Sequence, residues 1–302
     1  MAKILIFGAG SIGVFLGTKL HAAGHNVEIY GRRKLNKLTD KVLINDEEYQ
    51  APSRVHQLQS ADYDVIFMTV KLYDIEQALE AIKQHQINSQ ILAFIQNGLL
   101  EKSFYQQIKD HSKLTTLSIF TGYNLVDNQV LVTENGLGWH VEDTAVGREI
   151  CSLLNSSDIS CTVNSNLSQV RAIKMIWNAS SNALSALERK TLGELMKDQK
   201  LKQIVYKLLQ ESYEVLKDEY DLPSLESMQE RINRYANQMQ HHYSSMYQDV
   251  ISGRNTEVEF FNGLIVKLGK EKGIPTPYNQ DVYLRLREQT NPGGQRVLVS
   301  PR

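Results

Sequence analysis

The hydrophobic pattern in the first half of the chain alternates buried strands with amphipathic helices. Apolar runs of strand length cover Lys3 to Phe7, His25 to Tyr30, Asp64 to Val70 and Ile91 to Ile95. The residues after the first run repeat apolar side chains at helical spacing, and so do those between the last two runs. Strands buried on both faces and separated by helices predict an α/β domain with a parallel sheet.

Shorter segments follow, and their turns indicate antiparallel pairing. They cover Lys113 to Phe120, Gln129 to Thr133 and Leu137 to Val141, with Asp127-Asn128 and Asn135-Gly136 between them. An Asn-Gly pair between two alternating runs is typical of a β-hairpin. We therefore expect a small antiparallel extension of the same sheet and no further domain at this point.

Strand signals nearly vanish after Asn166, and long helical periods replace them. This change predicts two domains, residues 1–165 and residues 166–302, and the size of the chain favours the same division. The helical periods cover Arg171 to Leu187, Gln199 to Tyr220, Ser227 to Gln240 and Tyr243 to Ile251. A final long helix is predicted to begin at Thr256, with a capping-box spacing, and to end at Gly273-Ile274-Pro275.

A glycine-rich turn between the first strand and the first helix is the first sign of chemistry. Its residues are Gly8, Ala9, Gly10, Ser11, Ile12 and Gly13. In this context G-x-G-x-x-G is typical of Rossmann-type dinucleotide-binding domains, although an ordinary glycine loop is the alternative. Gly8 permits the tight turn, Gly10 lets the backbone approach a pyrophosphate, and Gly13 allows close packing of helix on sheet.

The end of the second strand bears on the choice of cofactor. An acidic residue here binds the ribose hydroxyls of NAD, whereas arginine accommodates the 2′-phosphate of NADP. The chain has Arg32 and Arg33 at this place, and Glu28 comes too early in the strand to reach the ribose. These residues favour NADPH as the cofactor, with a solvated basic turn as the alternative.

Two more polar residues follow strand ends. Lys71 comes after the third strand and Asn97 after the fourth. Open parallel sheets bind ligands at the carboxyl ends of their strands, so both residues are predicted to line the same crevice as the glycine turn. The alternatives are a solvated lysine and a plain Asn-Gly turn.

A polar stripe runs along the otherwise apolar helix predicted from Arg171 to Leu187. Lys174, Asn178 and Asn182 recur every four residues, which brings them within about 80° of one another on one helix face. Buried polar groups need partners, so the stripe faces either other polar residues or a cleft. Satisfied core amides are the alternative for the two asparagines, and the lysine on the same face favours a cleft.

Composition excludes several classes of partner. The chain has 33 Lys and Arg against 34 Asp and Glu, so it lacks the basic surface expected for binding nucleic acid or anionic lipid. No apolar run approaches the roughly 18 residues of a membrane span. Cys151 and Cys161 form no paired motif, so neither a disulfide framework nor a metal site is expected. We expect a cytoplasmic protein, monomeric or homodimeric, that acts on a small molecule.

Several motifs together resemble the ketopantoate reductase family. They are GAGSIG from Gly8, VK at Val70, QNG from Gln96, K-x3-N-x3-N from Lys174, SSMxQD from Ser244 and TEVEFFNG from Thr256. The motifs span nearly the whole chain. Those in the C-terminal half are more specific than the glycine turn, which unrelated dinucleotide-binding proteins share.

The resemblance implies reduction of 2-dehydropantoate to pantoate by NADPH, in pantothenate biosynthesis, in a cleft between a Rossmann domain and a helical domain. It also implies roles for single residues. Lys174 would hydrogen-bond the keto oxygen and stabilise or protonate the alkoxide, and Glu257 would tune Lys174. Asn178 and Asn182 would hold the hydroxyl and keto groups of the substrate, and Ser245 would hold its carboxylate. Lys71 and Asn97 would line the cofactor side.

The lysine role also follows from the chemistry of hydride transfer, which leaves negative charge on oxygen that a cation can stabilise. Burial lowers the pKa of a lysine, and a nearby Glu257 would raise the pKa of Lys174, so the two effects compete. The alternative for Glu257 is a favourable interaction with the dipole of the helix that it begins.

One position departs from the family pattern. His242, a candidate contact with the substrate, stands three residues before Ser245, where the family commonly has Asn. This keeps open the reduction of another branched 2-oxo acid, because pockets discriminate by only about 1–3 kcal/mol per methylene. A non-catalytic NADPH sensor is a third hypothesis, but the complete set of polar cleft residues argues against it.

Overall fold

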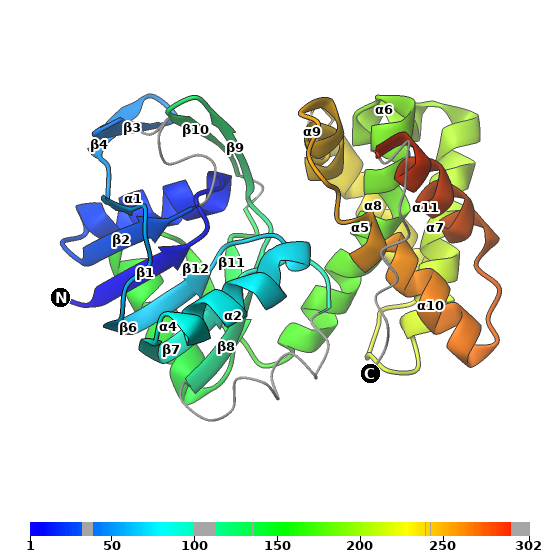
Figure 1. The fold of residues 1–302 in the computed structure, drawn as a ribbon. Coiled ribbons are helices and arrows are strands. Elements are labelled where there is room, and N and C mark those ends of the chain that lie inside the picture. The colour runs from blue at the N-terminus through cyan, green and yellow to red at the C-terminus, as the bar shows by residue number, and fades with distance from the viewer. Residues whose placement is uncertain (32–38, 100–112, 135, 239, 242, 291–302) are drawn as a thin grey trace. The chain divides into compact units, whose positions relative to one another are not determined.

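The chain divides into two compact units, Met1–Val170 and Arg171–Arg302, in a computed structural model that describes all residues except 32–38, 100–112, 135, 239, 242 and 291–302 (Figure 1). Helix α5, Leu167–Glu188, begins in the first unit and continues into the second. The predicted division after residue 165 falls just before this helix, since the helical periodicity starts before the chain changes unit.

The first unit is built on a large, mostly parallel sheet. In its described residues eight strands follow the order β12-β11-β8-β7-β6-β1-β2-β5, and every pairing is parallel except that of β8 with β11. Strand bounds are β1 Lys3–Phe7, β2 Asn26–Tyr30, β5 Ser53–Val55, β6 Ala61–Met68, β7 Ile87–Phe94, β8 Lys113–Ile119, β11 Trp139–Glu142 and β12 Cys161–Asn164. The prediction of a Rossmann-type α/β domain is confirmed.

The chain reverses direction across the sheet at β1. Helix α1, Ser11–Ala22, leads from β1 to β2 on one side, and the chain then returns to β6 on the other side of β1. Phe7 is level with Tyr30 and with Met68, so these three strands end at one edge. A crevice opens at such a switch point, and open α/β sheets bind their ligands there.

Helix α1 packs between the large sheet and a smaller one. Its Val14, Leu16 and Leu20 are at most 1% exposed and share a core with Ile4 and Ile6 of β1. Helix α4, Ala145–Ser156, joins the same core, whereas helix α2, Ile75–Gln84, follows a short 3₁₀ turn, η2, Leu72–Asp74, and packs against β7. Both sides of α1 are therefore buried, unlike an ordinary surface helix.

The antiparallel strands expected to extend the large sheet form, in part, a separate small sheet. It has the order β4-β3-β10-β9, with bounds β3 Lys41–Ile44, β4 Glu47–Gln50, β9 Gly122–Val126 and β10 Gln129–Thr133. Strands β9 and β10 form a hairpin at Asp127, but β10 pairs next with β3, and β11 joins the large sheet. The hairpin predicted at Asn135-Gly136 was therefore wrong, because the partner of β10 comes from a distant segment.

The second unit is helical throughout its described residues, as the sequence predicted. After α5 come α6 Leu192–Lys197, α7 Gln199–Leu216, α8 Leu225–Gln238, α9 Ser245–Ile251, the 3₁₀ turn η3 Val258–Phe260, α10 Asn262–Lys272 and α11 Pro277–Thr290. Side chains begin several of these helices: Thr191 and Glu194 form a capping box at α6, and Asp198 accepts from two backbone N–H groups of α7.

The helix predicted to begin at Thr256 and to be the last of the chain begins later, and another helix follows it. Glu257 precedes η3 without a side-chain cap, and α10 begins only at Asn262. Gly273, in the left-handed region with φ 70°, ends α10 as expected. The last helix is α11, which begins at Pro277. Its sequence is mostly polar, with few buried side chains, so its periodicity was weak.

We predict that Thr191→Ala lowers the free energy of unfolding by about 1 kcal/mol, the usual cost of losing an N-cap. The Thr191 hydroxyl also donates to the Gln240 carbonyl oxygen, at 2.7 Å. Thr256→Ala, at the cap expected from the sequence, serves as the matched control and should change stability by less than about 0.5 kcal/mol. Urea denaturation measures both, and equal losses would contradict the assignment.

Candidate functional site

Two glycines of the turn after β1 are required by the fold itself. Gly8 has a φ of +134°, and a Cβ added there would lie 2.6 Å from the Thr69 hydroxyl oxygen. A Cβ added at Gly13 would lie 1.9 Å from the Gly8 carbonyl oxygen. The Thr69 hydroxyl donates to that same carbonyl, with 2.6 Å between the oxygens. The turn is therefore held against the end of β6.

Gly10 is different, because nothing in the protein requires a glycine there. Its backbone is extended, with φ −83°, and a Cβ added to it would meet no atom within 4 Å. Gly10 is the N-cap of α1 and supplies no side-chain cap, so the open space lies at a helix N-terminus. Such a place accepts an anionic group that approaches the backbone N–H groups, and the pyrophosphate of a dinucleotide fits this requirement.

The other residues of the turn have structural contacts. The Ser11 hydroxyl accepts a hydrogen bond from the Leu125 backbone N–H at 3.1 Å, which ties the turn to β9. Ile12 packs against the core of the first unit, and Ala9 is 7% exposed. A Cβ at Gly31 would lie 2.5 Å from the Ala9 Cβ, so Gly31 lets the end of β2 approach the turn. Gly31 was not among the predicted site residues, because its need for glycine arises from a close approach in space and not from a sequence motif.

Gln96 joins the ends of two neighbouring strands and was also missed as an important residue. Its side-chain amide donates to the carbonyl oxygens of Met68, at 2.6 Å, and of Val70, at 3.0 Å. The hydrogen bonds hold the backbone that leads into Lys71, the residue before η2, and Gln96 itself precedes the half-buried Asn97. Lys71 and Asn97 thus follow adjacent strands at the edge that carries the glycine turn. Arg32 and Arg33 lie outside the described residues.

The polar stripe of the second unit lies on α5 as one face of a mostly buried helix. Lys174, Asn178 and Asn182 are partly buried. The side chains around them are almost fully buried: Met175, Ile176, Ala179 and Ala183 are each 0% exposed. Between Lys174 and Asn182, the residues that are only partly buried are therefore the three polar ones of the stripe and Trp177.

Of the two opposing effects on the pKa of Lys174, that of burial is larger than that of the Glu257 charge. Burial lowers the pKa of Lys174 from 10.5 to about 7, and the positive charge of Arg171 acts in the same direction. The negative charge of Glu257 opposes both by favouring the ammonium. Arg171 lies one turn earlier on α5 and is 8% exposed. Arg171 was not among the predicted site residues, although its spacing of three residues from Lys174 places the two side chains on one helix face.

Glu257 is a buried carboxylate, only 3% exposed, and does not lie in the first turn of an α-helix. The helix-dipole alternative required the predicted long helix to begin here, and that helix begins later. Glu257 instead acts on Lys174 through its charge. Burial of a carboxylate is costly unless a positive charge or hydrogen bonds compensate it, and Lys174 is one such charge.

A chain of buried amides connects the segment after Glu257 to α5. The Asn262 side chain donates to the Ala179 carbonyl oxygen at 2.8 Å and to the Asn279 side-chain oxygen at 2.9 Å. Asn279 in turn donates to Glu211 of α7 at 2.9 Å. Both asparagines are 0% exposed. These bonds link α5, α10, α11 and α7, and the sequence did not single out either asparagine for them.

Helix α9 begins beside the last asparagine of the stripe. The Ser244 hydroxyl donates to the Asn182 backbone carbonyl at 3.3 Å and accepts from the Tyr247 N–H at 3.1 Å. Ser245 is the exposed first residue of α9, and the buried Asp249 pairs with Arg254, with 2.9 Å between Oδ1 and Nε. His242 lies outside the described residues.

The described residues contain neither a cluster of metal ligands nor a membrane-spanning helix. Among the residues outside the gaps named above, no three His, Cys, Asp or Glu side chains come together as metal ligands. None of the helices in that part of the chain has the length and apolar character needed to cross a membrane.

Comparison with known proteins gives consistent matches over both units. The sequence model described as ketopantoate reductase PanE/ApbA matches residues 4–141, and the one for its C-terminal part matches residues 166–290. A 2-dehydropantoate 2-reductase of Vibrio cholerae is 26% identical over 290 residues, which are 94% of this chain and 97% of the relative.

Solved structures share the fold over nearly the whole chain. A PanE/ApbA family ketopantoate reductase from Ralstonia eutropha JMP134 has a TM-score of 0.85 at 24% identity and covers 96% of this chain and 99% of its own. A D-mandelate dehydrogenase, solved with NADH and anilino(oxo)acetate, also has a TM-score of 0.85, at 21% identity, and covers 96% of this chain and 98% of its own.

We predict opposite outcomes for alanine at two glycines of the turn. Gly13→Ala should lower the free energy of unfolding by about 1–3 kcal/mol, because its Cβ would overlap the Gly8 carbonyl. Gly10→Ala should lower the free energy of unfolding by less than about 1 kcal/mol, the usual size of an N-cap effect, and weaken binding of a nicotinamide dinucleotide at least about tenfold, because its Cβ projects into the open space. Thermal unfolding and a fluorescence titration with NADPH measure these effects. A destabilised Gly10→Ala with intact binding would refute the division of roles.

Proposed function

The chain belongs to the ketopantoate reductase family, a family of oxidoreductases, and we propose that it reduces 2-dehydropantoate to pantoate with NADPH. The observation that carries the proposal is Lys174, a lysine in a polar stripe whose pKa burial lowers to about 7. A buried ionisable group beside a counter-charge is typical of catalytic sites.

Lys174 would act on the substrate oxygen as hydrogen-bond donor and acid. When bound, NADPH supplies the hydride, and negative charge then develops on the former keto oxygen. A protonated Lys174 stabilises this oxygen and can pass its proton to it. A pKa near 7 brings the proton within easier reach than the ordinary 10.5, and Glu257 keeps the pKa from falling further, so a useful fraction stays protonated.

The other polar residues of the second unit would orient the substrate. We assign Asn178 and Asn182 to its hydroxyl and keto groups and Ser245 to its carboxylate, following the family motifs. The hydrogen bond from Ser244 to the Asn182 carbonyl supports this assignment, since it joins the start of α9 to the end of the stripe. His242 is proposed as a further contact at the carboxylate end.

The dinucleotide would bind along the edge where β1, β6 and β7 end. Gly8, Ala9, Gly10, Ser11, Ile12 and Gly13 form the proposed pyrophosphate cradle, with Lys71 and Asn97 on adjacent strand ends. Arg32 is proposed to bind the 2′-phosphate of NADPH. The open space at Gly10 supports dinucleotide binding in general, and the preference for NADPH is based on the arginines of the sequence.

Reduction of another 2-oxo acid is the second candidate function. The D-mandelate dehydrogenase has the same fold over nearly the full length of this chain and was solved with NADH. His242 also departs from the usual residue at the end of the pocket. Both observations concern which acid and which cofactor are used, and neither concerns the type of reaction.

The deciding experiment is a spectrophotometric assay of NADPH and NADH oxidation with 2-dehydropantoate, 2-oxoisovalerate and phenylglyoxylate. We expect the highest kcat/KM with 2-dehydropantoate and NADPH. A higher value with another acid would transfer the proposal to that acid, and a preference for NADH would refute the role of Arg32. Absence of oxidation with every acid would favour the sensor.

Lys174→Ala tests the catalytic assignment in the same assay. We expect kcat to fall by about 10²–10⁴-fold, the usual contribution of a general acid, with NADPH binding retained. Lys200→Ala, an exposed lysine of the same unit, is the matched control and should retain full activity. Near-normal turnover in Lys174→Ala would end the assignment.

The pH dependence of kcat/KM follows from the lowered pKa. Only the protonated Lys174 can donate, so kcat/KM should fall as the pH rises through about 7. Glu257 raises the pKa of Lys174, so Glu257→Gln should move this fall to lower pH. A profile that stays flat up to pH 9, or a shift to higher pH in the variant, would contradict the proposed pairing.

A further inference from the structure

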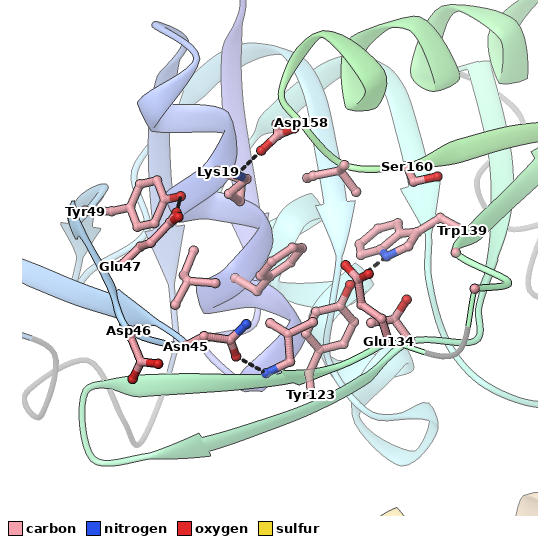
Figure 2. Close-up of a pocket in the computed structure, with 17 residues that line it drawn as sticks. Lys19, Asn45, Asp46, Glu47, Tyr49, Tyr123, Glu134, Trp139, Asp158 and Ser160 are labelled. Atoms are coloured by element: carbon pink, nitrogen blue, oxygen red, sulfur yellow. Dashed lines mark hydrogen bonds and ion pairs between the residues drawn. The ribbon is translucent and has the colours of Figure 1, made fainter. Parts of the chain in front are cut away.

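We propose that a pocket in the first unit, beside α1, binds a small organic ammonium ion with an aromatic or alkyl group (Figure 2). The pocket has a volume of about 440 Å³, within the usual range of roughly 300–1,000 Å³ for small-molecule sites. It lies between α1, the small sheet and the segments around β11, and none of its residues has a role in the proposed reduction.

Aromatic rings form one wall of the pocket in a fixed arrangement. The Tyr123 ring lies 4.6 Å from the Phe15 ring and 6.3 Å from the Trp139 ring, between centroids. The Trp139 indole N–H donates to the Tyr123 hydroxyl oxygen at 2.8 Å, and Figure 2 shows this bond at the wall. Trp139 is 1% exposed and Phe15 is 7% exposed, so neighbouring residues hold these rings in place. The wall is therefore formed before any ligand binds.

The charged residues of the pocket are mostly acidic. Its carboxylates are those of Asp46, Glu47, Glu134 and Asp158, against one ammonium group, that of Lys19. Lys19 is already paired, with its Nζ 2.6 Å from Asp158 and 5.3 Å from the centroid of the Tyr49 ring. The remaining carboxylates lie on exposed residues of the rim. The pocket thus has a negative charge that its own lysine does not balance.

Rings and carboxylates together select a cation with an apolar group. The rings of Tyr49 and Tyr123 are only partly buried, so their faces can attract an ammonium group, and the acidic rim adds a Coulomb attraction that an anion would experience as repulsion. A neutral molecule could fill the volume and donate a hydrogen bond to a carboxylate, but it would lack the Coulomb attraction. Burial raises the pKa of the Tyr123 hydroxyl, and the negative charge of Glu134 adds to the rise, so this carboxylate lies close to the aromatic wall. The ammonium is expected there.

Isothermal titration calorimetry of the full chain with phenethylammonium chloride tests the proposal. The matched probes are 2-phenylethanol and phenylacetate, which keep the ring and replace the cation by a neutral or an anionic group. We expect saturable binding of one equivalent of phenethylammonium, at least about tenfold weaker binding of the alcohol and none of phenylacetate. Equal binding of the alcohol, or no binding of the cation, would overturn the proposal.

Two variants locate the binding. Glu134→Gln removes a carboxylate of the pocket with little change of shape and should weaken phenethylammonium binding by about twofold to fivefold, the range for an exposed charge pair. Glu149→Gln, an exposed carboxylate of α4 outside the pocket, is the control and should leave binding unchanged. Equal effects of the two variants would place the cation elsewhere and refute the site.

Discussion

Desolvation of one ammonium group is the constraint that shapes the helical unit. Lys174 lies on a helix whose neighbouring side chains are buried, and its pKa falls to about 7 because the charged form loses water. A buried carboxylate, Glu257, limits the fall. Other buried polar groups of this unit also bond to one another: the Asn262 side-chain nitrogen donates to the Ala179 carbonyl and to the Asn279 side chain, although the Asn262 side-chain oxygen has no partner among the described residues. Charge and packing are therefore parts of the same arrangement, because burial raises the free-energy cost of every polar group that lacks a partner.

In the first unit, the corresponding constraint is the close approach of two backbone segments, the turn after β1 and the end of β6. The turn after β1 can lie against the end of β6 only because Gly8 and Gly13 have no side chains, and Thr69 then bonds to the Gly8 carbonyl. Gln96 extends the same edge to β7. Gly10 is left without a structural duty. The fold thus requires two of the three motif glycines, and the absence of a steric reason for the third supports the proposal that a dinucleotide approaches Gly10.

Some parts of both units follow from local rules and were predictable. Strand β1, the glycine turn, the helical second half and the polar stripe of α5 depend on periodicity and on the sterics of glycine, which act within a few residues. The failures have physical reasons too. Helix α11 has a weak apolar pattern, and Thr256 has the spacing of a capping box but begins no helix. A short local pattern is compatible with more than one tertiary setting.

The sequence by itself therefore determined the fold class, the turn at Gly8 to Gly13 and the face that carries Lys174, Asn178 and Asn182. Only the tertiary structure decided that β10 pairs with β3 and that Glu257 is buried without beginning an α-helix. It also decided that burial lowers the pKa of Lys174 by more than the negative charge of Glu257 raises it. The reason is that strand partners and desolvation depend on segments far apart in the chain. Periodicity tells which face of an element is apolar, but it does not tell what covers that face.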